Sequence, residues 1–173
     1  MRKFLTTAIV PVAFVSFGTA AQTMDLPEPV RVPAGHTMAM KAVGVGELTY
    51  ECRAKAGDAM AYEWVFVGPV ARLLDDSRSK EIGKYYAGPT WEAADGSKVT
   101  GKQVAIAPAS PGNIPLQLVK AEPAMGAGAM AGVTYIQRVN TKGGVAPAAP
   151  CAASAVGTKQ QVPYQADYVF FKM

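Results

Sequence analysis

Alternating apolar and polar residues fill most of the chain from about residue 38 onward. Leu48, Tyr50 and Cys52, for example, occupy every second position, with polar residues between them. Because successive side chains of a β-strand point to opposite faces of a sheet, this period of two predicts strands with one buried face. Frequent glycines and prolines separate the alternating stretches, as is typical of the turns of small all-β proteins.

The alternation predicts nine strands. They span Met38 to Val45, Glu47 to Arg53, Ala61 to Val67, Gly83 to Ala87, Thr90 to Ala94, Lys98 to Ala107, Ile114 to Lys120, Val133 to Val139 and Ala166 to Lys172. We therefore expect a single all-β domain, built as an antiparallel β-barrel or β-sandwich of roughly eight to ten strands with one disulfide.

The segments between the predicted strands contain turn and loop signals. Asp95-Gly96 favours a tight type I′ hairpin turn, because both residues tolerate the positive φ angles that this turn requires. Val70 to Asp76 is predicted to form a short helical turn. The ranges 121–132 and 143–157 are rich in Ala, Gly and Pro, and we expect them to be loops.

The first 21 residues have the three parts of a secretory signal peptide. Arg2 and Lys3 give a positive start, a mostly apolar segment follows, and small residues at positions 18–21 form a cleavage zone. A membrane anchor is the alternative, but the apolar segment is shorter than the ~20 residues of a spanning helix. We expect cleavage after Ala20 or Ala21, a periplasmic or secreted domain over residues 22–173, and no membrane span after cleavage.

Composition and charge exclude several classes of protein. The 173 residues include 17 Lys and Arg against 13 Asp and Glu, and loss of residues 1–21 leaves 15 against 13. With 17% charged residues and no basic run, the chain is not expected to bind nucleic acid. A sequence that is half apolar is also too hydrophobic for a disordered protein. His36 is the single histidine, which argues against histidine-dependent catalysis.

Cys52 and Cys151 are the only two cysteines of the chain. In an oxidising compartment a lone pair of cysteines most simply forms a disulfide. A pair of free redox-active thiols is the alternative, but the two residues lack the Cys-x-x-Cys spacing that lowers a thiol pKa. We therefore predict a structural disulfide that links an early strand to the loop before the last strand.

A series of short motifs runs in order along the chain from about Val32 to Phe171. The motifs are Val32-Pro33-Ala34-Gly35-His36, Tyr50-Glu51-Cys52-Arg53, Trp64-Val65-Phe66-Val67, Tyr86-Ala87-Gly88-Pro89-Thr90-Trp91-Glu92-Ala93, Asp95-Gly96-Ser97-Lys98-Val99, Ile136-Gln137-Arg138-Val139-Asn140-Thr141-Lys142-Gly143-Gly144 and Val162-Pro163-Tyr164-Gln165-Ala166-Asp167-Tyr168. Together they resemble the domain-of-unknown-function 3455 family of exported proteins. The family has no established activity or cofactor, so the resemblance implies neither. Its members often carry a histidine where this chain has Tyr85.

Aromatic and acidic residues gather around the expected bend at Gly88-Pro89. They are Tyr85, Tyr86, Trp91 and Glu92. Exposed aromatic rings beside a carboxylate suit a carbohydrate or small apolar ligand, because they offer a stacking surface and a directional hydrogen-bond acceptor. The alternative, which is the favoured one for Trp91 itself, is that Trp91 and one tyrosine fill the core. The leading hypothesis is a non-catalytic binding or envelope protein that uses these four residues.

Two other functions stay open. Glu51, Glu63 and Glu92 could supply the paired carboxylates of a hydrolase, which lie about 5–9.5 Å apart and include one group with a raised pKa. Acidic residues on the solvated face of a sheet are the ordinary alternative. The third possibility is a structural or interaction domain with no small-molecule site. No Gly-x-Ser-x-Gly, P-loop or Gly-x-Gly-x-x-Gly motif is present, so we predict no cofactor, assign no catalytic residue and favour a protein without enzymatic activity.

Two further groupings of polar or sulfur-containing residues have structural interpretations. His36, Met38 and Met40 alternate along the first predicted strand and could present soft ligands to Cu(I). Methionines that fill gaps in the core are the favoured alternative, so we predict no metal site. Asp167 lies among apolar residues, and we expect it to pair with Arg138 across neighbouring strands.

Overall fold

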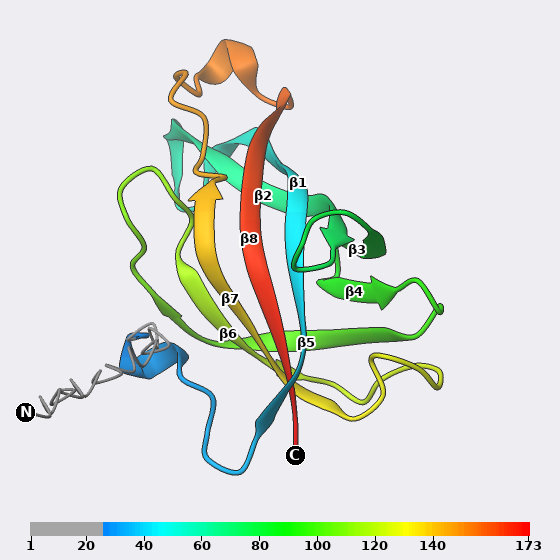
Figure 1. The fold of residues 1–173 in the computed structure, drawn as a ribbon. Coiled ribbons are helices and arrows are strands. Elements are labelled where there is room, and N and C mark those ends of the chain that lie inside the picture. The colour runs from blue at the N-terminus through cyan, green and yellow to red at the C-terminus, as the bar shows by residue number, and fades with distance from the viewer. Residues whose placement is uncertain (1–25) are drawn as a thin grey trace, which may run out of the picture.

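The computed structural model describes residues 26–173, so the predicted signal peptide lies outside the described residues. The strands of this region are β1 (Thr37–Lys55), β2 (Asp58–Leu74), β3 (Glu81–Tyr86), β4 (Thr90–Ala93), β5 (Lys98–Ala107), β6 (Leu116–Ala121), β7 (Val133–Gly143) and β8 (Lys159–Lys172), with short 3-10 helices η1 (Glu28–Val30) and η2 (Ala153–Ala155). Each strand pairs antiparallel with the next, and β8 pairs with β1, so the sheet closes into a barrel (Figure 1). The all-β prediction is confirmed, and the barrel is the correct one of its two architectures.

Two predicted strands, Met38–Val45 and Glu47–Arg53, are parts of the single strand β1. Gly46 lies inside this strand, at a position where β1 and β2 approach each other closely. A Cβ atom on Gly46 would lie 2.1 Å from the carbonyl oxygen of Val70, which only a glycine avoids.

The helical turn predicted over Val70–Asp76 is wrong, because β2 continues to Leu74. This part of β2 pairs with β1 on one side and with β3 on the other. Ala71 and Leu73 are buried, while Val70 is exposed, so burial follows the period of two of a strand. Strand pairing on both sides therefore decides the conformation of this segment.

The Asp95-Gly96 turn joins β4 to β5 at the predicted place, but it is not a type I′ turn. Gly96 has a φ of 85°, whereas Asp95 is not among the residues with positive φ. The Gly96 N–H donates to the Ala93 carbonyl over 2.9 Å. This geometry is that of a type I turn followed by a glycine in the left-handed region.

The loop between β6 and β7, residues 122–132, closes the end of the barrel that holds the Asp95-Gly96 turn (Figure 1). Met130 from this loop is fully buried and belongs to the barrel core. The loop is fixed by Asp95, whose Oδ2 accepts a hydrogen bond from the Ala129 N–H at 2.7 Å. Ser97 Oγ donates to Asp95 Oδ1 at 2.6 Å and accepts from the Met130 N–H at 3.1 Å.

We predict that Asp95→Asn destabilises the protein at neutral pH and that this difference disappears in acid. Hydrogen bonds from Ser97, first from its hydroxyl, and from Ala129 hold the pKa of Asp95 below its ordinary value. The stabilisation is therefore present above the unfolded-state pKa of about 3.9 and is lost as the pH falls through the lower folded-state pKa. Melting temperatures from pH 8 to pH 2 measure the effect, with Asp58→Asn on the β1–β2 hairpin as the control. A variant as stable as the wild type at pH 7 would contradict the role of Asp95.

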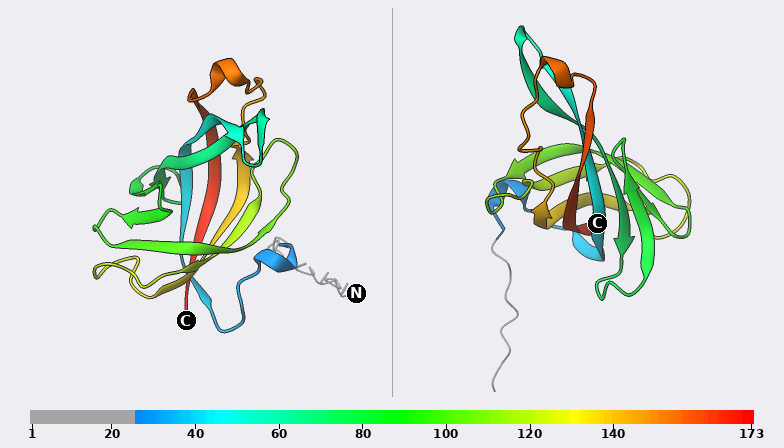
Figure 2. Two further views of the ribbon diagram at one scale, coloured as in Figure 1. Left: turned by 180° about the vertical axis from the view of Figure 1, so that it is seen from behind. Right: turned by 90° about the horizontal axis from the view of Figure 1, so that it is seen from above.

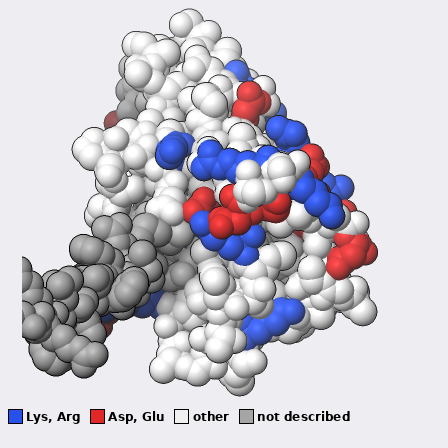
Figure 3. Space-filling model, in the orientation of Figure 1, with Lys and Arg blue, Asp and Glu red and all other residues white. Residues whose placement is uncertain are grey.

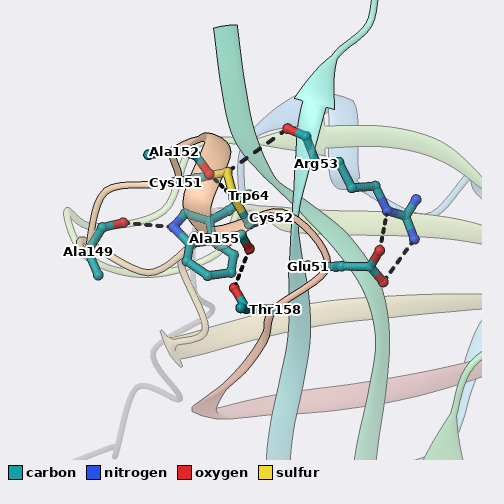
Figure 4. The surroundings of a disulfide bond; sticks show 9 residues. All are labelled: Glu51, Cys52, Arg53, Trp64, Ala149, Cys151, Ala152, Ala155 and Thr158. Atoms are coloured by element: carbon teal, nitrogen blue, oxygen red, sulfur yellow. Dashed lines mark hydrogen bonds and ion pairs between the residues drawn. A yellow bond between two sulfur atoms is a disulfide. The ribbon is translucent and has the colours of Figure 1, made fainter.

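The opposite end of the barrel, which we call the open end, carries the β1–β2 hairpin, the β3–β4 turn and the β7–β8 loop (residues 144–158). A disulfide between Cys52 and Cys151 ties this loop to β1, with 5.5 Å between the two Cα atoms, and the predicted bridge is confirmed (Figure 4). Trp64 Nε1 also donates to the Ala149 carbonyl at 2.7 Å, so both β1 and β2 hold the loop.

The segment before β1 packs against the outside of the barrel, where η1 lies against β5 and β6 (Figure 2). Val30 is fully buried there with Ala107 and Leu118. The Gln137 side chain also donates to the Val30 carbonyl. Among residues 26–173, no helix has the length and apolar character needed to cross a membrane.

Candidate functional site

The four residues that the sequence suggests as ligand contacts separate onto two faces of the sheet. Tyr85 and Trp91 are partners in the pairing of β3 with β4 and point into the barrel, where they are 6% and 1% exposed. Tyr86 and Glu92 lie at the alternate positions and face outward. The strand alternation therefore prevents the four from forming one binding surface.

Trp91 and Tyr85 belong to the aromatic interior of the barrel. Their rings are stacked, with centroids 4.7 Å apart and planes 20° apart. The ring of Tyr168 packs against both, with its centroid 5.0 Å from that of Tyr85 and 5.9 Å from that of Trp91. Trp91 thus fills the core and presents no stacking face at the protein surface.

Tyr86 and Glu92 form an ionic network on the outer surface. The Tyr86 hydroxyl donates to Glu92 Oε2 at 2.8 Å, and the ammonium groups of Lys84 and Lys98 lie 3.2 and 3.1 Å from the carboxylate. The Tyr86 hydrogen bond, with those from the two lysines, lowers the pKa of Glu92. Figure 3 shows Lys and Arg interspersed with Asp and Glu on this side of the molecule, so the surface charges are largely compensated.

The other two glutamates considered for hydrolysis also lie away from the barrel interior. Glu51 faces outward on β1, where its carboxylate lies 3.1 Å from Arg53 Nε (Figure 4). Lys159 Nζ lies 3.9 Å from the same carboxylate. The Arg53 hydrogen bond lowers the pKa of Glu51. Glu63 is exposed on β2. A glycosidase acid needs a raised pKa, so the downward shifts of Glu51 and Glu92 do not favour a hydrolase.

The open end of the barrel contains a cavity of about 310 Å³, which we call the mouth cavity. Strands β2, β3, β5, β6 and β7 and the β3–β4 turn contribute to its lining. Tyr85 and Val119 are buried side chains of its lining, and Phe66 adds an aromatic ring at the rim. Gln117 Nε2 donates to Gln103 Oε1 at 2.7 Å across the cavity wall. The volume is at the lower end of the roughly 300–1,000 Å³ of small-molecule sites.

A second depression, of about 460 Å³, adjoins the mouth cavity. The two share residues 67–69 and Ala87 in their walls. The second depression lies on the outside of the rim, where Val67 and Val70 are exposed. Together they extend from inside the barrel onto its outer edge, with Val67 and Val70 as exposed apolar residues and Thr49, Lys159 and Gln161 as polar residues of the outer depression.

Arg138 is the charged residue of the mouth cavity. In the sheet it stands opposite Gln117 of β6 and Tyr168 of β8, and it shares their inward-facing side. Its Nε and Nη2 donate to the Pro115 carbonyl at 3.3 and 3.0 Å. No Asp or Glu of residues 26–173 forms an ion pair with its guanidinium.

The predicted pairing of Asp167 with Arg138 is wrong. Asp167 stands opposite Val139, not Arg138, so the two side chains point to opposite faces of the sheet. On the outer face Asp167 Oδ2 lies 3.2 Å from Lys41 Nζ and accepts a hydrogen bond from Asn140 at 2.8 Å.

Tyrosine hydroxyls lie beside Arg138 inside the barrel. Those of Tyr164 and Tyr168 are hydrogen-bonded at 3.1 Å. Burial raises the pKa of Tyr85, Tyr164 and Tyr168, and the positive charge of Arg138 opposes this effect at each of them. The hydroxyls therefore stay neutral at physiological pH, and they can donate hydrogen bonds.

The residues considered as copper ligands do not share a face. An irregularity in the pairing of β1 with β8 places Met38 opposite Phe171 and Met40 opposite Phe170. Met40 packs against the core, as the favoured interpretation expects, whereas Met38 is 64% exposed. The His36 side chain instead contacts its own turn, with Nδ1 3.1 Å from the Pro33 carbonyl oxygen.

Sequence reasoning missed Phe66, Gln103 and Gln117 and assigned Arg138 a different role. One signal for Arg138 is present in the sequence, because Ile136 is two positions away and therefore shares its face. Ile136 is fully buried in the barrel, so the alternation alone places Arg138 inside.

A model of the protein family described as "Protein of unknown function (DUF3455)" matches residues 33–172. All the residues that line the mouth cavity fall inside this range. No curated protein and no solved structure matches the chain.

Proposed function

The chain belongs to the DUF3455 family of proteins of unknown function, and we propose that it is a non-catalytic binding protein that holds a small, largely apolar ligand in the mouth cavity. The observation that carries this proposal is the cavity of about 310 Å³ with its buried base and its amide and guanidinium groups. A closed barrel of eight strands has room for packed side chains or for one small ligand. Here the aromatic side chains pack around Trp91 and leave the open end unfilled.

The lining favours an apolar ligand over a carbohydrate. Phe66 and Val119 give the cavity apolar walls, and Val67 and Val70 expose further apolar surface at the adjoining rim. A carbohydrate site uses flat, accessible aromatic rings, but Trp91 is enclosed by Tyr85 and Tyr168. Polar groups in such a site orient a ligand whose affinity comes mainly from buried apolar surface.

We infer that binding takes place outside the cytoplasm. The Cys52–Cys151 disulfide supports this inference, because structural disulfides persist mainly in oxidising compartments. The signal-peptide pattern of residues 1–21 points to the same location.

Filling the mouth cavity is expected to weaken ligand binding strongly without unfolding the barrel. The probe is N-phenyl-1-naphthylamine, a neutral apolar dye whose fluorescence rises in apolar surroundings. Gln103→Phe adds an aromatic ring at the cavity wall, and we expect it to weaken the affinity for the dye by about tenfold or more, since it takes the space that the dye would occupy. Fluorescence titration of the mature domain measures the dissociation constant.

Lys102→Phe is the matched control, because it adds the same ring to the outward face of the same strand. Lys102 stands opposite Lys120 and is paired on the surface with Glu122 at 3.1 Å. We expect this variant to bind the dye as the wild type does. Equal binding by Gln103→Phe, or no saturable binding by the wild type, would refute the proposed site.

A further inference from the structure

We propose that the ligand carries an anionic group, most simply a carboxylate, and that Arg138 binds this group inside the mouth cavity. The inference rests on the proposed function, because it names the class of ligand for the same site. Such a ligand is an amphiphile with a carboxylate head and an apolar body.

The first argument is the uncompensated charge of Arg138. Seven basic side chains of residues 26–173 have carboxylate partners within 4.0 Å: Lys41, Arg53, Arg72, Lys84, Lys98, Lys102 and Lys159. Among the basic residues without such a partner, Arg138 is the one that lines the mouth cavity. Arg138 has none in this region, although it is partly buried and lines a cavity. Partial burial strengthens the attraction between a guanidinium and an anion, so an anion entering the cavity is stabilised beside Arg138.

The second argument is the orientation of the guanidinium donors. The Pro115 carbonyl accepts from Nε and from Nη2, which engages two of the five N–H groups. Three N–H groups remain free of this carbonyl. Two of them, one on Nη1 and one on Nη2, are parallel and point away from the side-chain stem. This pair matches the two oxygens of a carboxylate, which a guanidinium binds in a bidentate manner.

The third argument is that the groups around Arg138 can donate hydrogen bonds to an anionic ligand and carry no negative charge that would repel it. Tyr85 lines the cavity, and burial keeps its hydroxyl neutral by raising its pKa, as it does for the hydrogen-bonded hydroxyls of Tyr164 and Tyr168. Gln103 and Gln117 bring uncharged amides to the same cavity. No Asp or Glu of the described chain lines it.

The fourth argument concerns the apolar body of the ligand. Phe66 at the rim is 51% exposed, and Val67 and Val70 beside it are exposed as well. These side chains lead from the mouth cavity into the adjoining depression. A chain too long for 310 Å³ can therefore extend along this apolar rim while its carboxylate stays at Arg138.

The test compares decanoate with 1-decanol, which have the same number of carbon atoms and differ in charge. Each displaces N-phenyl-1-naphthylamine from the mature domain, and the displacement gives its affinity. We expect the wild type to bind decanoate about tenfold more tightly than decanol, which is the effect of one charge-assisted pair. Arg138→Gln should lose this preference and bind decanol as before.

Lys120→Gln is the matched control, because it removes one positive charge from an exposed position on β6. We expect it to keep the wild-type preference. If Arg138→Gln does not fold by circular dichroism, salt titration of the wild type tests whether decanoate binding depends on a charge pair. Salt should weaken decanoate binding and leave decanol binding unchanged, since ions screen a partly exposed charge pair.

The outcomes separate the two proposals. Absence of saturable dye binding, or full binding by Gln103→Phe, refutes the proposed function. Tight binding of the dye and of decanol without a preference for decanoate refutes the anionic ligand and leaves the apolar site standing. A preference for decanoate that survives in Arg138→Gln refutes the assignment of Arg138.

Discussion

Replacing both cysteines, as Cys52→Ala with Cys151→Ala, is expected to lower the free energy of unfolding by up to about 4.7 kcal/mol. The disulfide joins residues 99 positions apart, so it removes much of the conformational freedom of the unfolded chain. In a domain of this length the loss corresponds to a fall of roughly 10–20 °C in melting temperature. Native-state contacts of the β7–β8 loop, such as that of Trp64 with Ala149, are expected to survive the change.

Urea unfolding of the protein with and without a reducing agent measures this effect. Reduction of the wild type should reproduce the stability of the double variant, whereas the double variant should not respond to the reducing agent. Single variants are unsuitable because the remaining thiol can form dimers. A loss of less than about 1 kcal/mol would show that the bridge does not constrain the unfolded chain as its loop length implies.

The part of the fold that depends on local pattern is predictable from the sequence. β5 has the predicted bounds, Lys98–Ala107, because alternation and the turn before it define both ends. The predicted last strand begins at Ala166, whereas β8 begins at Lys159. The first residues of β8 are in the strand because they pair with β1. They are exposed, so the sequence shows no alternation of apolar and polar residues that would predict this part of the strand.

The candidate site was harder to predict, because it depends on which strands become neighbours. Tyr85 and Tyr86 are adjacent in sequence, and the alternation already requires them to face opposite sides of the sheet. The residues that form the mouth cavity, such as Phe66, Gln117 and Arg138, come from strands far apart in the chain. Closure of the barrel brings them together, and the sequence alone does not specify the register that aligns them.

Trp91→Ala is expected to lower the free energy of unfolding by about 3–5 kcal/mol, the usual cost of removing a buried tryptophan. The Trp91 side chain is 1% exposed and packs against Tyr85 and Tyr168, so its loss leaves a void at the centre of the barrel. Urea unfolding followed by circular dichroism measures the change without relying on tryptophan fluorescence. A loss under about 1 kcal/mol would contradict the core role of Trp91.

Trp91→Phe is the informative comparison, because it keeps an aromatic ring and removes the indole N–H. Trp91 Nε1 is buried and has no hydrogen-bond partner within the described chain, and an unsatisfied buried donor costs about 1–3 kcal/mol. Removing this unsatisfied N–H offsets part of the packing energy that is lost with the smaller ring. We therefore expect Trp91→Phe to be much more stable than Trp91→Ala. We also expect it to bind N-phenyl-1-naphthylamine within about twofold of the wild type, since Trp91 does not line the mouth cavity. A stable Trp91→Phe variant that fails to bind the dye would instead make Trp91 a ligand contact, as its position in the sequence first suggests.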